Sequence, residues 1–126
     1  MKKMDKTELL IDIFDLIDTS KFPLTMEMCD KNDYNDAILH LYQDENGKPV
    51  GVAIYEVYPN DYCYLSSFEI DKTKRGNYYG TAFMDILQNK FKTIKLHCMP
   101  GVEHFYIQCG FVPAEEKGYF VWTRSY

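Results

Sequence analysis

A short basic stretch with two glycines is the part of the sequence best suited to chemistry. It spans residues 70–82 and joins a β-branched and aromatic segment to one with helical apolar spacing. The first amides of a helix lack intrahelical acceptors, and together with the helix dipole they attract an anionic oxygen. Gly76 and Gly80 allow close approach of the backbone, and Lys74 and Arg75 add positive charge. The stretch predicts a phosphate-binding loop, although the same pattern is typical of a solvated connection.

The residue order in this loop resembles the acetyl-coenzyme A signature of the GCN5-related N-acetyltransferases (GNATs). That signature is a branched residue followed by Arg/Gln-x-x-Gly-x-Gly/Ala, and Ile70, Arg75 and Gly80 match it. Tyr78 stands where the first motif glycine is usual. The loop amides remain available, because only a proline would remove one. Replacing the glycine by Tyr78 therefore affects how closely a pyrophosphate can approach the loop, and not whether the loop forms.

A second segment, residues 105–111, resembles the Phe/Leu-Tyr-x-x-x-Gly-Phe of the fourth helix and following strand in that family. The resemblance implies that Tyr106 protonates the departing coenzyme A thiolate. A phenol with an ordinary pKa of about 10 keeps its proton at neutral pH and can donate to a thiolate whose conjugate acid lies near about 8.5. The alternative is a core tyrosine bonded to a carbonyl. Met99 and Val102 replace the usual asparagine and alanine, and Met99 cannot supply the hydrogen bonds of an amide.

The resemblance also implies where acetyl-coenzyme A binds as co-substrate. The strand backbone before the loop would hold the pantetheine and thioester, and the loop would hold the pyrophosphate. The cofactor-binding residues implied in this way are Phe68, Glu69, Ile70, Arg75, Gly76, Asn77, Tyr78, Tyr79, Gly80 and Thr81.

A proton acceptor for the attacking amine is harder to assign. In addition to Tyr106, we expect Glu69 to be a catalytic residue that accepts a proton directly or through water. Glu56 on the neighbouring strand is an alternative. Both carboxylates are also typical of a solvated strand surface. The three histidines lie at positions that are more often structural or exposed: His40, His97 and His104.

Composition limits the class of protein. A chain of 126 residues forms one domain, and 46% hydrophobic with 16% aromatic residues excludes a disordered chain. No apolar run of about 18 residues exists to cross a membrane. The net charge of −5 argues against nucleic acid as the main partner and favours an amine-bearing acceptor.

The four cysteines contain no C-x-x-C pair, and the histidines are not spaced with them as zinc ligands. We therefore expect reduced thiols, no metal site and a cytoplasmic protein. The lysines of the first residues are followed by acidic positions that interrupt any signal-peptide core.

The N-terminal part combines a clear helix with an undecided segment. Asp5 and Glu8 form a capping box, in which Asp5 is the N-cap and Glu8 reaches back, and apolar helical spacing follows to about Asp18. Residues 19–35 predict either a short helix or an irregular strand, ending in a polar loop. The initial strand usual in GNATs has no obvious counterpart before Asp5, so this edge is expected to be absent or supplied by residues 22–29.

The remaining elements are clearly punctuated. We predict strands over residues 37–43, 50–58 and 62–70, a helix after the loop, a strand over 93–98 parallel to the third, a helix over 102–109, and a hairpin of 111–113 with 119–124. This order coincides with the GNAT fold. The predicted class is a single-domain α/β (α+β) acyl-CoA N-acyltransferase fold over residues 1–126, with a central mixed, mostly antiparallel sheet flanked by helices.

The resulting hypothesis is an N-acetyltransferase in which an amine attacks acetyl-coenzyme A directly in a ternary complex. The acceptor is a small-molecule amine or a peptide or protein amine, with no nucleic acid or membrane partner and with a homodimer permitted. Two alternatives remain: a coenzyme A-binding regulatory domain with little or no turnover, and a small protein-interaction domain. The acceptor, the acyl-chain preference and the general base stay open.

Overall fold

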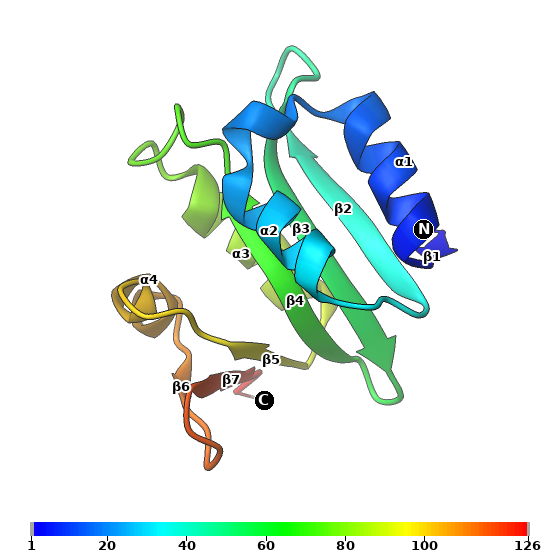
Figure 1. Cartoon of the computed structure of the whole chain (residues 1–126). Helices are drawn as coiled ribbons and strands as arrows, with labels where there is room; N and C mark the ends of the chain where they lie inside the picture. Colours follow the sequence, from blue (N-terminus) through cyan, green and yellow to red (C-terminus); the bar gives the residue numbers. More distant parts are fainter. Residues whose placement is uncertain (1, 126) are drawn as a thin grey trace.

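A computed structural model describes residues 2–125 of the chain, whose strands form a seven-stranded sheet (Figure 1). The elements in chain order are β1 (Lys3–Met4), α1 (Lys6–Leu16), the 3-10 helix η1 (Thr19–Lys21), α2 (Pro23–Lys31), β2 (Ala37–Gln43), β3 (Pro49–Tyr58), β4 (Tyr62–Ile70), α3 (Tyr79–Lys90), β5 (Thr93–His97), α4 (Glu103–Gln108), β6 (Val112–Pro113) and β7 (Tyr119–Thr123). The sheet order is β1-β2-β3-β4-β5-β7-β6. Neighbouring strands are antiparallel except for the parallel pair β4 and β5. The predicted mixed, mostly antiparallel sheet is confirmed.

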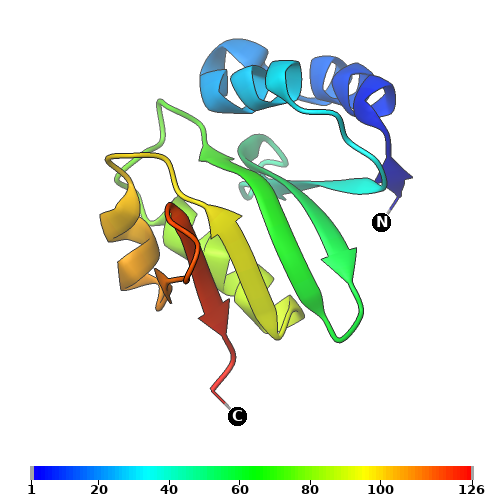
Figure 2. The same ribbon diagram turned by 60° about the horizontal axis from the view of Figure 1, so that its bottom comes forward.

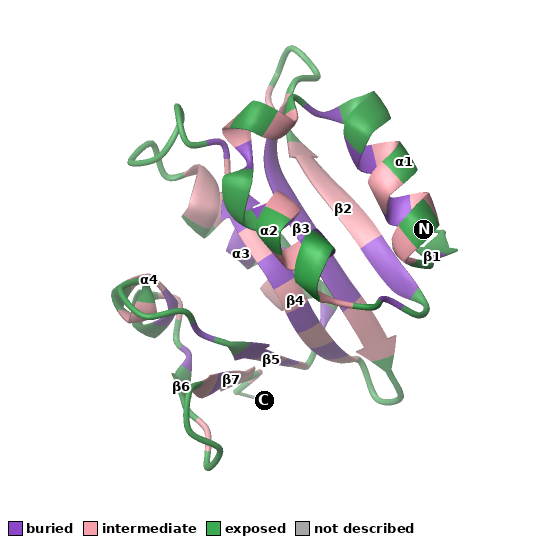
Figure 3. Cartoon of the chain, viewed as in Figure 1, coloured by how far each residue is buried: buried purple, intermediate pink, exposed green. Residues whose placement is uncertain are grey.

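Helices cover the sheet on both faces (Figure 2). On one face α1 and α2 bury a core that includes Leu9, Ile13 and Phe22 together with Val52 and Ile54 of β3. On the other face α3 and α4 bury a second core around Phe83 and Leu87. Because β3 contributes side chains to both cores, it is buried along most of its length (Figure 3). This accounts for the continuous apolar run in its sequence.

The N-terminal region differs from the expectation in two respects. Residues Lys3–Met4 pair with Ile38 and Ala37, so the initial strand is present as a two-residue edge. Residues 22–29, the other source considered for that edge, form the N-cap residue Phe22 and most of helix α2, which Pro23 begins. A two-residue strand carries too few alternating positions to stand out in a sequence.

The cap of α1 is confirmed in part. The side chain of Asp5 accepts a hydrogen bond from the Glu8 amide, as an N-cap should. The carboxylate of Glu8 pairs with Lys2 at 3.0 Å instead of reaching back to the cap residue. The helix ends at Leu16, and Asp18 caps η1 through Ser20.

The C-terminal half follows the prediction closely. Helix α3 crosses to β5, which runs parallel to β4 as expected. Helix α4 ends before Gly110, whose φ of +93° suits a residue after a helix end. Strands β6 and β7 form the predicted final hairpin.

A β-bulge in β4 opens the sheet. Ile54 of β3 is paired with Ser67, whereas Tyr55 is paired with Leu65, so Ser66 is an extra residue without a partner on β3. The parallel pairing of β4 with β5 also ends at Leu65. Beyond this point β4 and β5 diverge, and the two strands separate toward α3 and α4 (Figure 2).

The described part of the chain holds no helix with the length and hydropathy that a membrane crossing requires. Nor does it bring three or more histidine, cysteine or acidic side chains together in a group that could hold a metal ion.

The buried thiols and phenols predict that the protein becomes less stable at alkaline pH. Burial raises the pKa of Cys29 to about 11 and those of Cys63 and Tyr34 to about 12. A group whose pKa is higher in the folded state stabilises the fold fully below its unfolded pKa and loses that contribution as pH rises through the folded value. We expect the free energy of unfolding to stay level around neutral pH and to fall from about pH 9 upward, as urea titrations at several pH values would measure.

Cys63→Ala supplies the control, since it removes one of these groups and should make the alkaline fall shallower. An unfolding free energy that stays constant through pH 11 would contradict the expectation.

Candidate functional site

The divergence of β4 and β5 forms a cavity of about 670 Å³. Its walls come from α2, β3, β4, the loop after β4, the start of α3, β5 and α4. The following residues predicted from the sequence line it: Phe68, Glu69, Ile70, Arg75, Gly76, Tyr78, Tyr79, Gly80, Thr81 and Tyr106. Asn77 does not, and its side-chain amide donates to the Lys74 carbonyl at 3.1 Å. Side chains from loop, strand and helix therefore converge on one space.

The strand edge that borders the cavity has free backbone groups. Up to Leu65, β4 is paired with β5 on this side. Ser66 is the bulge residue, and from Ser67 onward β4 is paired with β3 alone. Backbone donors and acceptors on the open side are therefore available to a bound molecule. Bulges next to active sites commonly have this effect.

The loop after β4 is shaped by Asp71, a residue that the sequence analysis did not single out. Its carboxylate is buried and accepts from the amide and the hydroxyl of Thr73 at 2.8 and 2.7 Å. Its own amide donates to the Val50 carbonyl at 2.8 Å. The Asp-x-Thr spacing is the signal that could have revealed this Asx-turn.

The start of α3 presents unpaired amides to the cavity. The first intrahelical bond runs from the Ala82 amide to the Tyr78 carbonyl at 3.0 Å, and no side chain caps the helix. The amides of Tyr79, Gly80 and Thr81 thus precede the hydrogen-bonded turns, where the helix dipole favours an anion. All three residues line the cavity.

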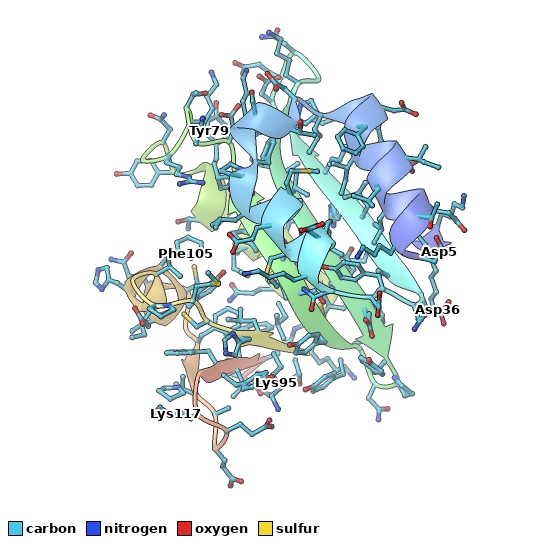
Figure 4. The ribbon with its side chains drawn as sticks, in the orientation of Figure 1. Asp5, Asp36, Tyr79, Lys95, Phe105 and Lys117 are labelled. Atoms are coloured by element: carbon cyan, nitrogen blue, oxygen red, sulfur yellow. The ribbon has the colours of Figure 1, made fainter. Side chains whose placement is uncertain are left out.

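The two loop glycines serve different purposes. Gly76 has a φ of +87° and open space around its α-carbon, so the backbone conformation requires it. A β-carbon on Gly80 would lie 3.1 Å from the ring of Phe105. Gly80 therefore lets α3 approach α4, and Phe105 also stacks on Phe68 with centroids 5.8 Å apart. Figure 4 shows Tyr79 at the start of α3 and Phe105 on α4.

Tyr78 occupies a left-handed conformation at the N-cap of α3, with φ 64° and ψ 5°. Glycine adopts this conformation at little cost, whereas other residues are strained there. The ring is 84% exposed and does not fill the loop. The left-handed backbone therefore explains why a glycine is usual at this position. A tyrosine adopts the same conformation only with steric strain.

Arg75 is anchored to the end of β4. Its Nε donates to the Ile70 carbonyl at 3.2 Å, and its Nη2 donates to Glu69 Oε2 at 3.1 Å. The side chain remains about half exposed. Together with Lys74, it places positive charge beside the unpaired amides of α3.

Glu69 is not the solvated strand carboxylate that was considered as one alternative, because it is 3% exposed. Its Oε1 accepts from the amide and hydroxyl of Thr25 at 2.7 and 2.8 Å, and its Oε2 accepts from the Leu24 amide at 3.0 Å as well as from Arg75. It therefore binds the first turn of α2, where the helix dipole favours a negative charge. These contacts fit a residue that positions α2 and the loop, and its role as base stays a prediction.

Tyr106 lies on α4 with 9% of its surface exposed. Its ring contacts those of Phe105 and Phe111, with centroids 5.2 and 5.6 Å apart. Burial raises the pKa of its phenol above the ordinary value, and nearby Cys98 and Cys109 act in the same direction. Within residues 2–125 no carbonyl accepts from this phenol, contrary to the core-tyrosine alternative. The hydroxyl can therefore serve a molecule in the cavity.

Of the other candidate proton acceptors, two line the cavity and two do not. Glu56 and His97 line the cavity. His40 lies elsewhere, with its Nδ1 3.0 Å from the hydroxyl of Tyr55, and burial lowers its pKa. His104 is exposed on α4 outside the cavity lining.

The part of the cavity formed by the end of α2 was not predicted from the sequence. Glu27, Asn32, Asp33 and Tyr34 line it, although they lie more than thirty residues before the motif loop. No local pattern marks them, because α2 and β4 meet only through tertiary packing.

A comparison with protein families identifies the "Acetyltransferase (GNAT) family" over residues 7–111. Comparison with curated protein sequences finds no match.

Solved structures with the same fold include the Tetrahymena GCN5 (TM-score 0.65, 13% identity, covering 95% of this chain and 89% of that one). A spermidine N-acetyltransferase chimera from Vibrio cholerae and hSSAT has a TM-score of 0.62 at 13% identity, covering 98% and 95% of the two chains. A candidate streptothricin acetyltransferase of Bacillus anthracis, in complex with acetyl-coenzyme A, has a TM-score of 0.59 at 18% identity, covering 71% and 64%.

The strained backbone at Tyr78 yields a testable expectation. Tyr78→Gly should be at least as stable as the parent, gaining up to about 1 kcal/mol, because relief of the left-handed strain exceeds the entropy cost of glycine. The matched variant Tyr78→Val should lose about 1–2 kcal/mol, since a β-branched residue fits this conformation worse. Chemical denaturation measures both, and a valine variant as stable as the glycine variant would refute the assignment.

The bonding of Glu69 yields a second expectation. Glu69→Gln should lower the free energy of unfolding by about 2 kcal/mol or more, because an amide cannot accept all four bonds and leaves buried donors unpaired. Glu45→Gln, on the exposed β2–β3 turn, is the charge-matched control and should change stability by less than about 0.5 kcal/mol. Equal stability of the two variants would show that the Glu69 contacts contribute nothing.

Proposed function

This chain belongs to the GNAT acetyltransferase family, an enzyme family that uses acetyl-coenzyme A, and from that premise we propose that it transfers the acetyl group to a primary amine by direct attack in a ternary complex. The observation that carries the proposal is the cavity at the divergence of β4 and β5. It combines an open strand edge, unpaired helix amides and a free phenol in one space.

The residues present fit acetyl-coenzyme A on chemical grounds. The amides at the start of α3, with Lys74 and Arg75, would hold the pyrophosphate, because helix N-termini and cationic side chains bind phosphate oxygens. The open backbone of β4 at Phe68, Glu69 and Ile70 would hold the pantetheine arm. When bound, acetyl-coenzyme A supplies an activated thioester.

In this proposal Tyr106 donates to the leaving thiolate. Burial keeps the phenol protonated at neutral and mildly alkaline pH, because its pKa lies above the ordinary value. Tyr106 lines the cavity that β4 borders. A donor that stabilises charge developing on the sulfur accelerates the departure of the thiol.

The attacking amine must lose a proton during the reaction. Of the carboxylates expected from the sequence, Glu56 lines the cavity without the saturated bonding of Glu69, and it accepts from the Tyr58 hydroxyl at 2.6 Å. His97 lines the same space. Either group can accept the proton directly or through water.

Calorimetric titration with acetyl-coenzyme A tests the binding half of the proposal. The parent protein should bind, and Arg75→Glu should weaken binding about tenfold or more, because it replaces attraction by repulsion at the pyrophosphate. Lys48→Glu, on the exposed β2–β3 turn, is the matched charge reversal and should leave the affinity unchanged. No binding by the parent at millimolar ligand would refute the proposal.

Thiol release in an amine screen tests the chemical half. Tyr106→Phe should lower kcat about 100-fold while changing the acetyl-coenzyme A dissociation constant less than about threefold, since the hydroxyl acts on the leaving group. In the parent, kcat should show no loss through deprotonation of Tyr106 below about pH 10. Full activity in Tyr106→Phe would remove the phenol from the mechanism, and binding without release of thiol would leave a non-catalytic coenzyme A-binding domain.

A further inference from the structure

A second cavity, of about 410 Å³, lies between α3 and the end of α4. Tyr78, Thr81 and Gln108 line both this cavity and the main one, so the two spaces adjoin at the start of α3. The side-chain amide of Gln88 donates to the Cys109 carbonyl at 2.8 Å. This bond ties α3 to the residue that follows α4 and so holds the walls of the second cavity together.

The second cavity differs from the main one in its charge. Lys74 and Arg75 line the main cavity, whereas the described residues that line the second include no cationic side chain. The polar groups of the second cavity include the Thr81 hydroxyl, the Gln108 amide and the Asp85 carboxylate. Together they offer hydrogen-bond donors and acceptors. A phosphate finds no positive charge there, but the edge of an uncharged, nitrogen-rich ring finds partners for its own donors and acceptors.

Tyr78 places an aromatic ring at the junction of the two cavities. The residue is 84% exposed, and within residues 2–125 its side chain takes part in no hydrogen bond or ring contact. The ring therefore adds little to the packing of the fold, although the left-handed backbone that carries it is strained. Residues held in such conformations cluster at ligand clamps, where the strain serves function. A ring with no contact in the fold is free to stack on a ligand.

The chemistry of coenzyme A determines which part of it reaches this ring. Its pyrophosphate joins the pantetheine arm on one side to a ribose and adenine on the other. In the proposed function the pyrophosphate binds at the start of α3 and the arm runs along β4 in the main cavity. One ribose separates the adenine from the pyrophosphate, so the base must lie next to the start of α3. Tyr78 and the second cavity are located there.

We infer that Tyr78 stacks on the adenine of bound coenzyme A and that the edge of the base enters the second cavity. This inference rests on the proposed function and adds a contact with the base to those of the loop with the phosphates. The glycine that is usual at this position in the family has no ring, so the contact belongs to this chain in particular. Bases stack on aromatic side chains through their π-faces, so the ring strengthens binding although it adds strain to the fold.

Three ligands separate the base from the phosphates. Dephospho-coenzyme A lacks only the phosphate on the ribose of coenzyme A, whereas phosphopantetheine lacks the whole nucleotide. In calorimetric titrations Tyr78→Leu should weaken the binding of coenzyme A and of dephospho-coenzyme A about tenfold each, because leucine keeps an apolar side chain but has no π-face. The same variant should change the affinity for phosphopantetheine less than about twofold, since that ligand has no base to stack.

Two control variants assign the effect to the ring of Tyr78. Tyr78→Phe keeps the ring and removes only the hydroxyl, so it should bind coenzyme A within about twofold of the parent affinity. Phe14→Leu removes a ring that is 62% exposed on α1 and that lies outside the lining of both cavities. It should leave the affinities for all three ligands unchanged.

Etheno-coenzyme A, whose modified adenine is fluorescent, reports the stacking directly. Its emission should be quenched on binding to the parent and to Tyr78→Phe, and it should stay near the free value on saturated Tyr78→Leu. Unquenched emission in the parent, unchanged coenzyme A affinity in Tyr78→Leu, or an equal loss for all three ligands would overturn the inference and spare the proposed function. Failure of the parent to bind any of these ligands would overturn both.

Discussion

The extra residue in β4 is the constraint on which the site depends. A β-strand alternates its side chains, so the bulge at Ser66 exchanges the faces of the residues that follow it. Phe68 and Ile70 thereby join the core that α3 covers, together with Cys63 and Leu65. The same bulge coincides with the end of the parallel pairing to β5. The strand remains attached to β3 on one side and presents free backbone groups on the other.

Glu69 holds three segments around that opening. It binds the first turn of α2 through two backbone amides and the Thr25 hydroxyl, and it binds Arg75 in the loop. A buried carboxylate is stable only when donors replace its water, and here the donors come from elements that must be placed correctly for the cavity to form. The residue that the sequence offers as a base therefore acts, by its contacts, as a positioning residue for the walls of the site. Preorganised walls of this kind lower the cost of binding.

The departures from the family pattern lie at positions where the structure tolerates them. Tyr78 replaces a glycine at a left-handed position, but its ring points into solvent and leaves the α3 amides accessible. Met99 follows β5 by two residues, lines the cavity and is exposed. Neither residue occludes the space between β4 and β5. The loop thus keeps its shape through Asp71 and Gly76, and the cost of Tyr78 is local backbone strain.

Sequence alone determined the first helix, the order of elements from residue 37 onward and the motif residues, because these depend on local spacing. Apolar periods of two and of 3.6 residues mark the strands and helices, and the loop of residues 70–82 combines glycines, basic residues and a helix start within one short stretch. Tertiary structure decided the rest. The two-residue β1 is too short to show a period. The contacts of Glu69 and the cavity-lining positions of Asp33 and Tyr34 depend on α2 lying against β4, a contact between residues about forty positions apart. Side-chain burial and hydrogen bonding at such contacts follow from packing in three dimensions. The spacing of residues along the chain does not show which distant segments pack together.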